Sequence, residues 1–215
     1  MDPRQDVFKT FEVPDPIRIR KVVEGIRFHF GSLQGLSVLE CGVARGGLVD
    51  LLRSEGARCC GVDIHSRPGM EGIEFQQADL NDGIPRFPTM FDVIFAGEVM
   101  EHLVDDALFV RSARDQINPN GLLILTVPNL VFSVNRVRML FGATPMFAYA
   151  PFHYHIYTRR TLTDLLEQEG LSILALRSSH LLFSTRRSRL GRIFEIGGDF
   201  FPSFGAHLIA FARKG

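Results

Sequence analysis

Three carboxylates stand where three short apolar runs of the sequence end. Glu40 lies near the end of the first run, Asp63 directly follows the second, and Asp79 follows the third. If these runs are parallel strands of one sheet, their carboxyl ends share an edge, where ligands bind. A carboxylate there can meet a cationic amino group, the hydroxyls of a ribose, or the exocyclic amine of an adenine. The spacing therefore predicts a site for a nucleoside-containing ligand.

Small residues follow the first of these runs. Gly42, Ala44 and Gly46 allow a tight turn and let a ligand approach the backbone without meeting a Cβ atom. The N–H groups at the start of the next helix can then hold an anionic group. Gly42, Ala44 and Gly47 also satisfy the spacing of a nicotinamide-dinucleotide fingerprint, and Asp63 serves a ribose in both cases. The turn by itself leaves both nucleotide cofactors open.

Histidines are the natural candidates for a general base. His102 follows the apolar run 91–95, and His153 and His155 precede a predicted helix. A positioned base contributes about 10²–10⁴-fold when the nucleophile is a hydroxyl. If their segment is extended, the alternating spacing of His153 and His155 directs both side chains to one face. Each of the three is a catalytic candidate; the alternatives are packing or helix capping for His102 and loop ordering for the other two.

Alternating strands and helices must position these residues. Apolar runs of strand length alternate with stretches of helical periodicity, which indicates βαβ units and a mostly parallel sheet covered on both faces. Right-handed crossovers place the loops after the strands along one edge. The Asn-Pro-Asn-Gly sequence at 118–121 predicts a turn before the fifth strand. The predicted strands are 37–41, 58–62, 73–77, 91–95, 121–126, 171–176 and 206–212, and the predicted helices include 17–30, 105–117 and 158–170.

The order and spacing of these motifs resemble the class I methyltransferases, especially the small-molecule group that includes the ubiquinone-biosynthesis O-methyltransferases. The resemblance implies an α/β, Rossmann-like doubly wound sheet of seven strands, mostly parallel with the last strand antiparallel, and S-adenosylmethionine as cofactor. Two positions depart mildly from the family pattern, since Ala44 replaces a usual glycine and Glu40 stands where aspartate is frequent. The matching segments are VLECGVARGG, GVDIH, ADL, FDVIFAGEVMEHL, GLLILTVPN, HYHIYTRRTLTDLLEQEG and AHLIAFARK.

The resemblance also implies a contact with the cofactor for each matching residue. Asp63 would bind the ribose hydroxyls, with Ile64 beside the adenine. Asp79 and Leu80 would meet the edge and the face of the adenine. The remaining contacts would come from Ala96, Gly97 and Glu98 at the methionine end and from Glu40, Gly42, Ala44 and Gly46 at the glycine-rich turn.

The resemblance also raises the question of whether a divalent metal ion binds. Some ubiquinone-type O-methyltransferases use a Glu-x-x-Glu-His arrangement for such an ion, and Glu98, Glu101 and His102 match its letters. The same letters occur in relatives that have no metal. We therefore expect no metal site, with Glu101 and His102 acting as polar residues at the start of a helix.

Composition limits the other function classes. The 215 residues suit one domain, and a formal net charge of zero gives no basic footprint for nucleic acid. The three cysteines include the adjacent Cys59 and Cys60, which cannot form an ordinary disulfide framework and indicate a reducing compartment. The sequence shows neither a signal peptide nor an apolar run of membrane-spanning length, so we expect a cytoplasmic protein.

Basic and aromatic residues are concentrated in the last part of the sequence. From Leu130 onward there are 11 Lys and Arg against 5 Asp and Glu, a net charge of +6. The aromatic stretch 130–157 fits either a lid over the acceptor or additional core. The stretch 180–205 contains a basic amphipathic segment, which fits either a solvated helix or peripheral contact with a membrane or a lipid-linked, anionic substrate.

Together these features predict a single methyltransferase domain, with an N-terminal arm and helix at 1–30 and substrate-side insertions at 130–157 and 180–205. The expected reaction transfers a methyl group to a small-molecule acceptor, with a hydroxyl of a lipid-like or saccharide biosynthetic intermediate favoured. One alternative is an NAD(P)-dependent oxidoreductase with the same glycine-rich turn, although the sequence lacks its Tyr-x-x-x-Lys pair. Another is a non-catalytic S-adenosylmethionine-binding module. The oligomeric state is not predicted.

Overall fold

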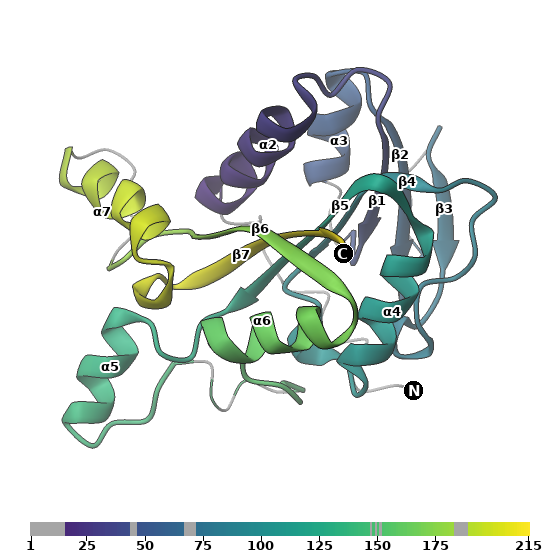
Figure 1. Cartoon of the computed structure of the whole chain (residues 1–215). Coiled ribbons are helices and arrows are strands. Elements are labelled where there is room, and N and C mark those ends of the chain that lie inside the picture. Colours follow the sequence, from purple (N-terminus) through teal and green to yellow (C-terminus); the bar gives the residue numbers. More distant parts are fainter. Residues whose placement is uncertain are drawn as a thin grey trace.

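A seven-stranded sheet flanked by helices forms the body of the protein (Figure 1). The computed structural model describes residues 16–43, 47–66, 72–146, 148, 150, 152–182 and 189–215. The strands are β1 (Ser37–Cys41), β2 (Arg58–Asp63), β3 (Glu74–Gln77), β4 (Phe91–Gly97), β5 (Ile117–Pro128), β6 (Leu171–Ser178) and β7 (His207–Lys214). The helices are α2 (Pro16–Phe30), α3 (Gly47–Ser54), α4 (Asp106–Gln116), α5 (Ser133–Leu140), α6 (Arg159–Gln168) and α7 (Arg189–Phe200), with the short 3-10 turns η2 (Leu80–Asp82), η3 (Met100–His102) and η4 (Pro202–Phe204).

The strand order is β3-β2-β1-β4-β5-β7-β6. Neighbouring strands from β3 to β5 pair in parallel, whereas β7 runs antiparallel to both β5 and β6. The chain begins the sheet with β1 in the middle and adds β2 and β3 on one side. It then returns to place β4 on the other side of β1. This arrangement confirms the predicted mixed sheet with an antiparallel last strand, and it creates the topological switch point at which such sheets bind ligands.

Alternate side chains of each strand pack into two apolar layers, one on each face of the sheet. Val93 and Phe95 of β4 belong to the layer beneath α2 and α3, whereas Ile94 and Ala96 belong to the layer beneath α4 and α6. Figure 1 shows the same two pairs of helices on opposite faces. Because both faces are covered, the central strands are apolar at nearly every position, which is why they were visible in the sequence as continuous runs.

Side-chain caps begin two of the helices where the sequence predicted a start. The Asp105 carboxylate accepts a hydrogen bond from the Leu108 N–H at the start of α4. The Thr158 hydroxyl accepts one from the Thr161 N–H at the start of α6. Such caps satisfy backbone donors that have no partner within the helix.

The turn predicted at residues 118–121 is instead a bulge within β5. Phe91 pairs with Ile117 and Val93 pairs with Leu122, so four residues of β5 stand opposite Asp92 alone. The Asn118 side chain donates to the Asp92 carboxylate (2.8 Å). The chain therefore bends at the expected place but then resumes pairing with the same neighbouring strand.

Helix α5 lies in the aromatic stretch 130–157, where the sequence analysis placed no helix. The buried Asn135 of α5 donates to the carbonyl groups of Leu130 and Met146 and accepts from the Met146 N–H. These bonds fold the segment back on itself. Residues 1–15, the predicted arm, lie outside the described residues. In the part of the chain that is described, no helix is long and apolar enough to cross a membrane.

Candidate functional site

The ends of β1, β2 and β4 are level with one another at the carboxyl edge of the sheet. Cys41 of β1 is in register with Val62 of β2 and with Ala96 of β4, so the next residue of each strand lies at the same height. Neighbouring strands are about 4.8 Å apart, so the row extends over about 10 Å. Its members are Gly42, Asp63 and Gly97. The row presents one carboxylate and two positions without side chains, as predicted for a ligand-binding edge.

Gly42 begins the turn that the sequence singled out. Its φ of 75° lies in the left-handed region, and an added Cβ atom would lie 2.6 Å from Cγ2 of Val99. Any other residue would therefore both strain the backbone and collide with the neighbouring loop. Ala44 and Gly46, the other two small residues of the predicted turn, lie outside the described residues.

Asp63 and Asp79 each close a turn of their own. The buried Asp63 carboxylate accepts a hydrogen bond from the His65 N–H (2.9 Å). Asp79 accepts from the N–H (3.0 Å) and the side-chain amide (2.8 Å) of Asn81, which begins η2. A carboxylate has about four acceptor positions, so these bonds by themselves do not fill either group.

The apolar residues predicted beside the adenine differ in exposure. Ile64 is half-buried next to Asp63. Leu80 is buried and belongs, with Ala96, to the apolar layer beneath α4 and α6. A contact of Leu80 or Ala96 with the cofactor would therefore involve the edge of the core, and these assignments stay predictions.

Glu40 is buried and bonded to the start of α3. Its Oε2 accepts a hydrogen bond from the Val49 N–H (3.0 Å). Burial raises the pKa of Glu40 to about 8, although the bond to Val49 opposes this rise. The carboxyl group therefore joins β1 to α3 from inside the protein. Its predicted contact with a cationic ligand stays a prediction.

Glu98, directly after β4, forms an ion pair with Arg18 of α2. Nη1 of Arg18 lies 2.8 Å from Oε1 of Glu98, and both side chains are largely buried. Glu98 has a φ of 56°, which is uncommon for a residue other than glycine and occurs often at functional sites. The Thr126 hydroxyl donates to Oε1 of Glu98 (3.3 Å), and Nε2 of His207 lies 3.5 Å from Oε2.

Arg18 also carries a donor for which the described part of the chain offers no acceptor. Its Nε is buried and finds no hydrogen-bond partner among the described residues. An unsatisfied buried donor is costly, and such groups are often satisfied by a ligand. Because Arg18 approaches Glu98 next to the row of strand ends, this donor indicates an anionic group of a ligand at the same edge.

Sequence reasoning did not select Arg18. The apolar residues of the predicted helix 17–30, such as Val22 and Ile26, are spaced to share one face. Arg18 nevertheless precedes the buried Val22 by four residues and the buried Gly25 by seven, so it lies on the same helix face. A charged residue at an apolar position of an otherwise regular pattern was the signal available in the sequence.

The structure brings two of the three candidate histidines together. The rings of His102 and His153 meet edge to face, with centroids 4.7 Å apart. Nδ1 of His102 lies 3.1 Å from the Phe152 carbonyl oxygen. Burial lowers the pKa of His102, which favours the neutral imidazole, while the bond to Phe152 opposes this effect. This pair has the chemistry of a general base.

His155 lies apart from that pair. Its Nε2 is 3.2 Å from the Val104 carbonyl oxygen, and its Nδ1 is 3.6 Å from the Asp106 carboxylate. The same carboxylate accepts a hydrogen bond from the buried Tyr157 hydroxyl (2.7 Å). These contacts join the loop before α6 to the start of α4, which agrees with the alternative of a loop-ordering role.

Glu101 lies buried beside the histidine pair. Its Oε2 has no hydrogen-bond partner in the described part of the chain, and burial, together with the nearby Glu98, raises its pKa well above the ordinary value. Potential ligand atoms of Glu101, His102 and His153 lie within 4.8 Å of one another. Glu98 is paired with Arg18 and does not belong to this cluster, so the full Glu-x-x-Glu-His set is not assembled here.

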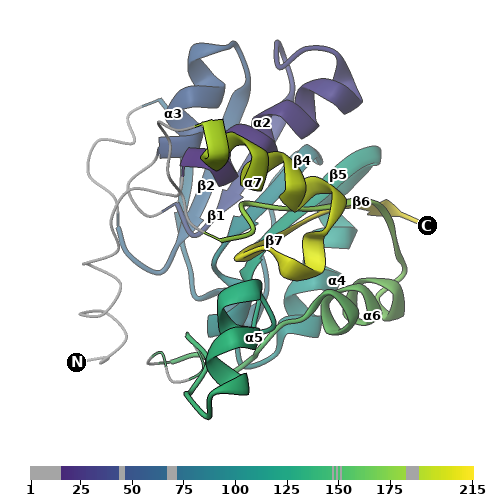
Figure 2. The ribbon, with the colours of Figure 1, turned by 90° about the vertical axis from the view of Figure 1, so that its left-hand side faces the viewer.

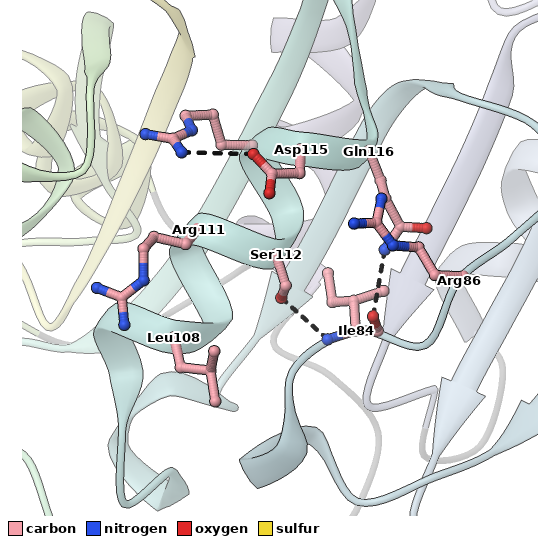
Figure 3. Close-up of a pocket in the computed structure, with 8 residues that line it drawn as sticks. Ile84, Arg86, Leu108, Arg111, Ser112, Asp115 and Gln116 are labelled. Carbon is pink, nitrogen blue, oxygen red and sulfur yellow. Dashed lines mark hydrogen bonds and ion pairs between the residues drawn. The ribbon is translucent and has the colours of Figure 1, made fainter.

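Two cavities lie near these elements. A small one, of about 10 Å³, is lined by Glu101, His153 and Tyr157 among others and has room for about one water molecule. A larger one, of about 290 Å³, lies beside α4 and is lined by Ile84, Arg86 and Ser112 among others (Figure 3). None of the predicted site residues lines the larger cavity, so it is separate from the site at the strand ends.

Comparison with known proteins identifies similar sequences. A family model described as a methyltransferase domain matches residues 17–176. A ubiquinone biosynthesis O-methyltransferase of Azorhizobium caulinodans is 32% identical over 135 residues, which cover 54% of this chain and 52% of that protein. Its counterpart from Methylobacterium nodulans is 29% identical over 184 residues, covering 74% and 72%. The first of these alignments spans about half the length of the relative.

Solved structures share the fold at low sequence identity. The 1,6-didemethyltoxoflavin-N1-methyltransferase of Burkholderia thailandensis, solved with 1,6-didemethyltoxoflavin and S-adenosylhomocysteine, has a TM-score of 0.64 and 15% identity, with 98% of this chain and 82% of that chain covered. The N-methyltransferase NodS of Bradyrhizobium japonicum, in complex with S-adenosylhomocysteine, has a TM-score of 0.61 and 14% identity, with coverages of 98% and 96%.

Proposed function

The chain belongs to the methyltransferase domain family, in the class I S-adenosylmethionine-dependent group, and from this premise we propose that it methylates a hydroxyl of a small biosynthetic intermediate. The observation that carries the proposal is the row of Gly42, Asp63 and Gly97 at the switch point of the sheet. A side chain at Gly42 or Gly97 would collide with Val99 or Phe95, so these close-packed strand ends need glycine. Asp63 ends β2, which lies between β1 and β3, and its carboxylate matches the hydroxyls of a ribose.

The pair of Arg18 and Glu98 suits the amino-acid end of the cofactor. That end carries one carboxylate and one ammonium group, and the pair offers a guanidinium donor and a carboxylate acceptor. The Nε of Arg18, which has no acceptor among the described residues, would donate to the cofactor carboxylate, and Glu98 would accept from its ammonium group. S-adenosylmethionine supplies a methyl group on a cationic sulfonium, which is attacked in line by the acceptor oxygen.

Alignment and proton removal are the tasks left to the protein. Holding acceptor and methyl group in line removes up to about 7–11 kcal/mol of the barrier in favourable cases. As the new O–CH₃ bond forms, the C–S electron pair stays on sulfur and the hydroxyl proton must leave. Because the Phe152 carbonyl can only accept, Nδ1 of His102 holds the hydrogen and Nε2 carries the lone pair that takes this proton.

The predicted alternatives receive less support. The family match does not favour an NAD(P)-dependent oxidoreductase, although the glycine-rich turn alone had allowed it. A non-catalytic binding module would keep the strand-end row but would not need a neutral histidine beside it.

An acceptor panel tests the proposal. Purified protein is incubated with methyl-labelled S-adenosylmethionine and with phenols, saccharides, long-chain alcohols and amines, and labelled product is measured. We expect methylation of a hydroxyl compound and, in His102→Ala, a kcat lowered about 10²-fold or more without loss of S-adenosylhomocysteine affinity. Labelling of amines alone, or no product despite cofactor binding, would contradict the proposal.

A further inference from the structure

Two helices expose apolar residues to solvent on one side of the molecule. Helices α5 and α7 both lie on the side that faces the viewer in Figure 2, and they occupy the same side of Figure 1. More than half of the large hydrophobic side chains that are exposed in the described residues belong to α5, α7 and the segments that directly follow them. These are Val137, Met139, Leu140, Phe141, Met146, Ile193, Ile196, Phe200, Phe201 and Phe204, and we call this surface the α5–α7 face.

Helix α7 is bound to the body of the protein by its polar side. Glu195 forms an ion pair with Arg20 of α2, and Asp199 forms one with Nζ of Lys21 (2.8 Å). The Lys21 ammonium is buried and also donates to the carbonyl groups of Ser178 and Glu195 (2.7 Å each). Since Glu195 and Asp199 are one helical turn apart, both acids of α7 point to the same side and are occupied there.

The apolar side of α7 consequently points outward. Ile193, Ile196 and Phe200 follow the spacing of a single helix face, and Ile193 is 61% and Phe200 75% exposed. A helix on the surface of a soluble protein normally turns such a stripe toward the core. In α7 this stripe lies on the solvent side instead.

Helix α5 continues the same surface. The guanidinium of Arg136 lies 4.4 Å from the centre of the Phe204 ring, and the Ser133 hydroxyl donates to the Phe204 carbonyl oxygen (2.7 Å). Beyond this junction, Leu140 and Phe141 at the end of α5 are each 80% exposed. The apolar residues of the two helices thus form one connected face.

Positive charge accompanies these apolar residues. Residues 130–163 contain no Asp or Glu. Arg136 and Arg138 of α5 are exposed, and no ion pair to either is found in the described part of the chain; their Nε atoms donate to backbone oxygens. Arg192 is exposed next to the apolar stripe of α7. Arginines among protruding aliphatic and aromatic side chains complement a surface that is anionic outside and apolar beneath.

From this arrangement we propose that the α5–α7 face docks peripherally onto an anionic phospholipid bilayer. The exposed isoleucine, leucine and phenylalanine side chains enter the boundary between headgroups and acyl chains, and the arginines bind the lipid phosphates. The segment after α5 contributes Met146 and His153 to the small cavity at Glu101. If the proposed function holds, docking therefore directs the acceptor side of the site toward the bilayer; the docking itself does not depend on that function.

Vesicle sedimentation tests this proposal with one variant and one matched control. Phe200→Glu places a charge in the apolar stripe, whereas Phe28→Glu changes an 87% exposed phenylalanine near the far end of α2. Wild type is expected to sediment with vesicles of equal parts phosphatidylcholine and phosphatidylglycerol and to stay in solution with phosphatidylcholine alone. We expect Phe200→Glu to weaken partitioning about tenfold or more and Phe28→Glu to change it less than about twofold.

Other outcomes would overturn the proposal. These are no sedimentation of the wild type with anionic vesicles, equal losses in both variants, or a wild-type dimer in light scattering that Phe200→Glu converts to monomer without any vesicle binding. The last result would identify the face as a contact between two copies of the chain. The vesicle measurement is made without cofactor, and the thermal midpoint of each variant confirms its folding, so the result is separate from that of the acceptor panel.

Discussion

The carboxyl group of Glu40 lies inside the protein, bonded to the Val49 N–H. Its pKa is about 8 in the folded protein, against 4.5 in a solvated chain. Between these values the folded protein keeps a proton that the unfolded chain has released, so the stability contributed by Glu40 falls as pH rises from about 5 to about 8. The loss amounts to at most about 4 kcal/mol. Glu40→Gln resembles the protonated group and is expected to flatten this part of the curve.

Urea unfolding of the cofactor-free protein at several pH values measures the effect. Glu24→Gln, a change at an exposed carboxylate of α2, is the control and should keep the wild-type slope. Identical pH dependence in wild type and Glu40→Gln would show that the buried carboxyl is ionised throughout.

Arg18 is the residue on which cofactor orientation is expected to depend. Arg18→Met removes the guanidinium from Glu98 and from the ligand carboxylate, and a lost bond to a charged group costs about 1.5–3 kcal/mol. Affinity for S-adenosylhomocysteine should therefore fall by about one to two orders of magnitude in calorimetry. Arg213→Met, a change at an exposed arginine of β7, should leave the affinity unchanged. Wild-type affinity in Arg18→Met would show that Arg18 does not bind the cofactor.

Individual residues also show how far sequence reasoning reaches. Gly42 and Asp63 could be predicted as site residues because strand ends and turns leave local signals, namely a small residue after an apolar run and an acid directly after the next. Arg18 was missed because its ion pair with Glu98 joins segments that are distant in the sequence, and a charged residue at an apolar helix position is only a weak local signal.

Among the elements, α7 depends on one lysine of α2 for its position. Lys21→Met would leave the carbonyl groups of Ser178 and Glu195 and the carboxylate of Asp199 without their shared donor. The two carbonyl groups would be left unsatisfied at about 1–3 kcal/mol each, whereas the partly exposed Asp199 carboxylate can be solvated, so the free energy of unfolding should fall by about 2–6 kcal/mol. Chemical denaturation measures the change. A value within about 0.5 kcal/mol of wild type, as surface substitutions usually give, would mean that α7 is held by other contacts.

Elements with local signals were predicted and those without were not. Helical periodicity predicted α4 and α6, and apolar runs predicted the strands. The bulge at residues 118–121 depends on pairing with β4, and α5 depends on the bonds of Asn135 to residues on both sides of it. Neither kind of interaction can be recognised from a short window of sequence.

At the scale of the whole molecule, alternation of strands and helices was enough to predict the sheet, because a parallel sheet requires crossover helices. It was also enough to predict that the strand ends share one edge. The distribution of charge was visible in the sequence as well, but its arrangement was not: both acids of α7 face inward to α2, and this could be seen only once α2 and α7 were placed side by side.

Calorimetric titration of S-adenosylhomocysteine into wild type and Asp63→Ala tests the central claim most directly, with Asp82→Ala, a change at an exposed carboxylate of η2, as control. The row at the strand ends predicts one binding site per chain in the wild type and in Asp82→Ala, and an affinity about ten- to a hundredfold weaker in Asp63→Ala. No heat of binding in the wild type, or equal affinity in Asp63→Ala, would contradict a nucleoside site at this edge.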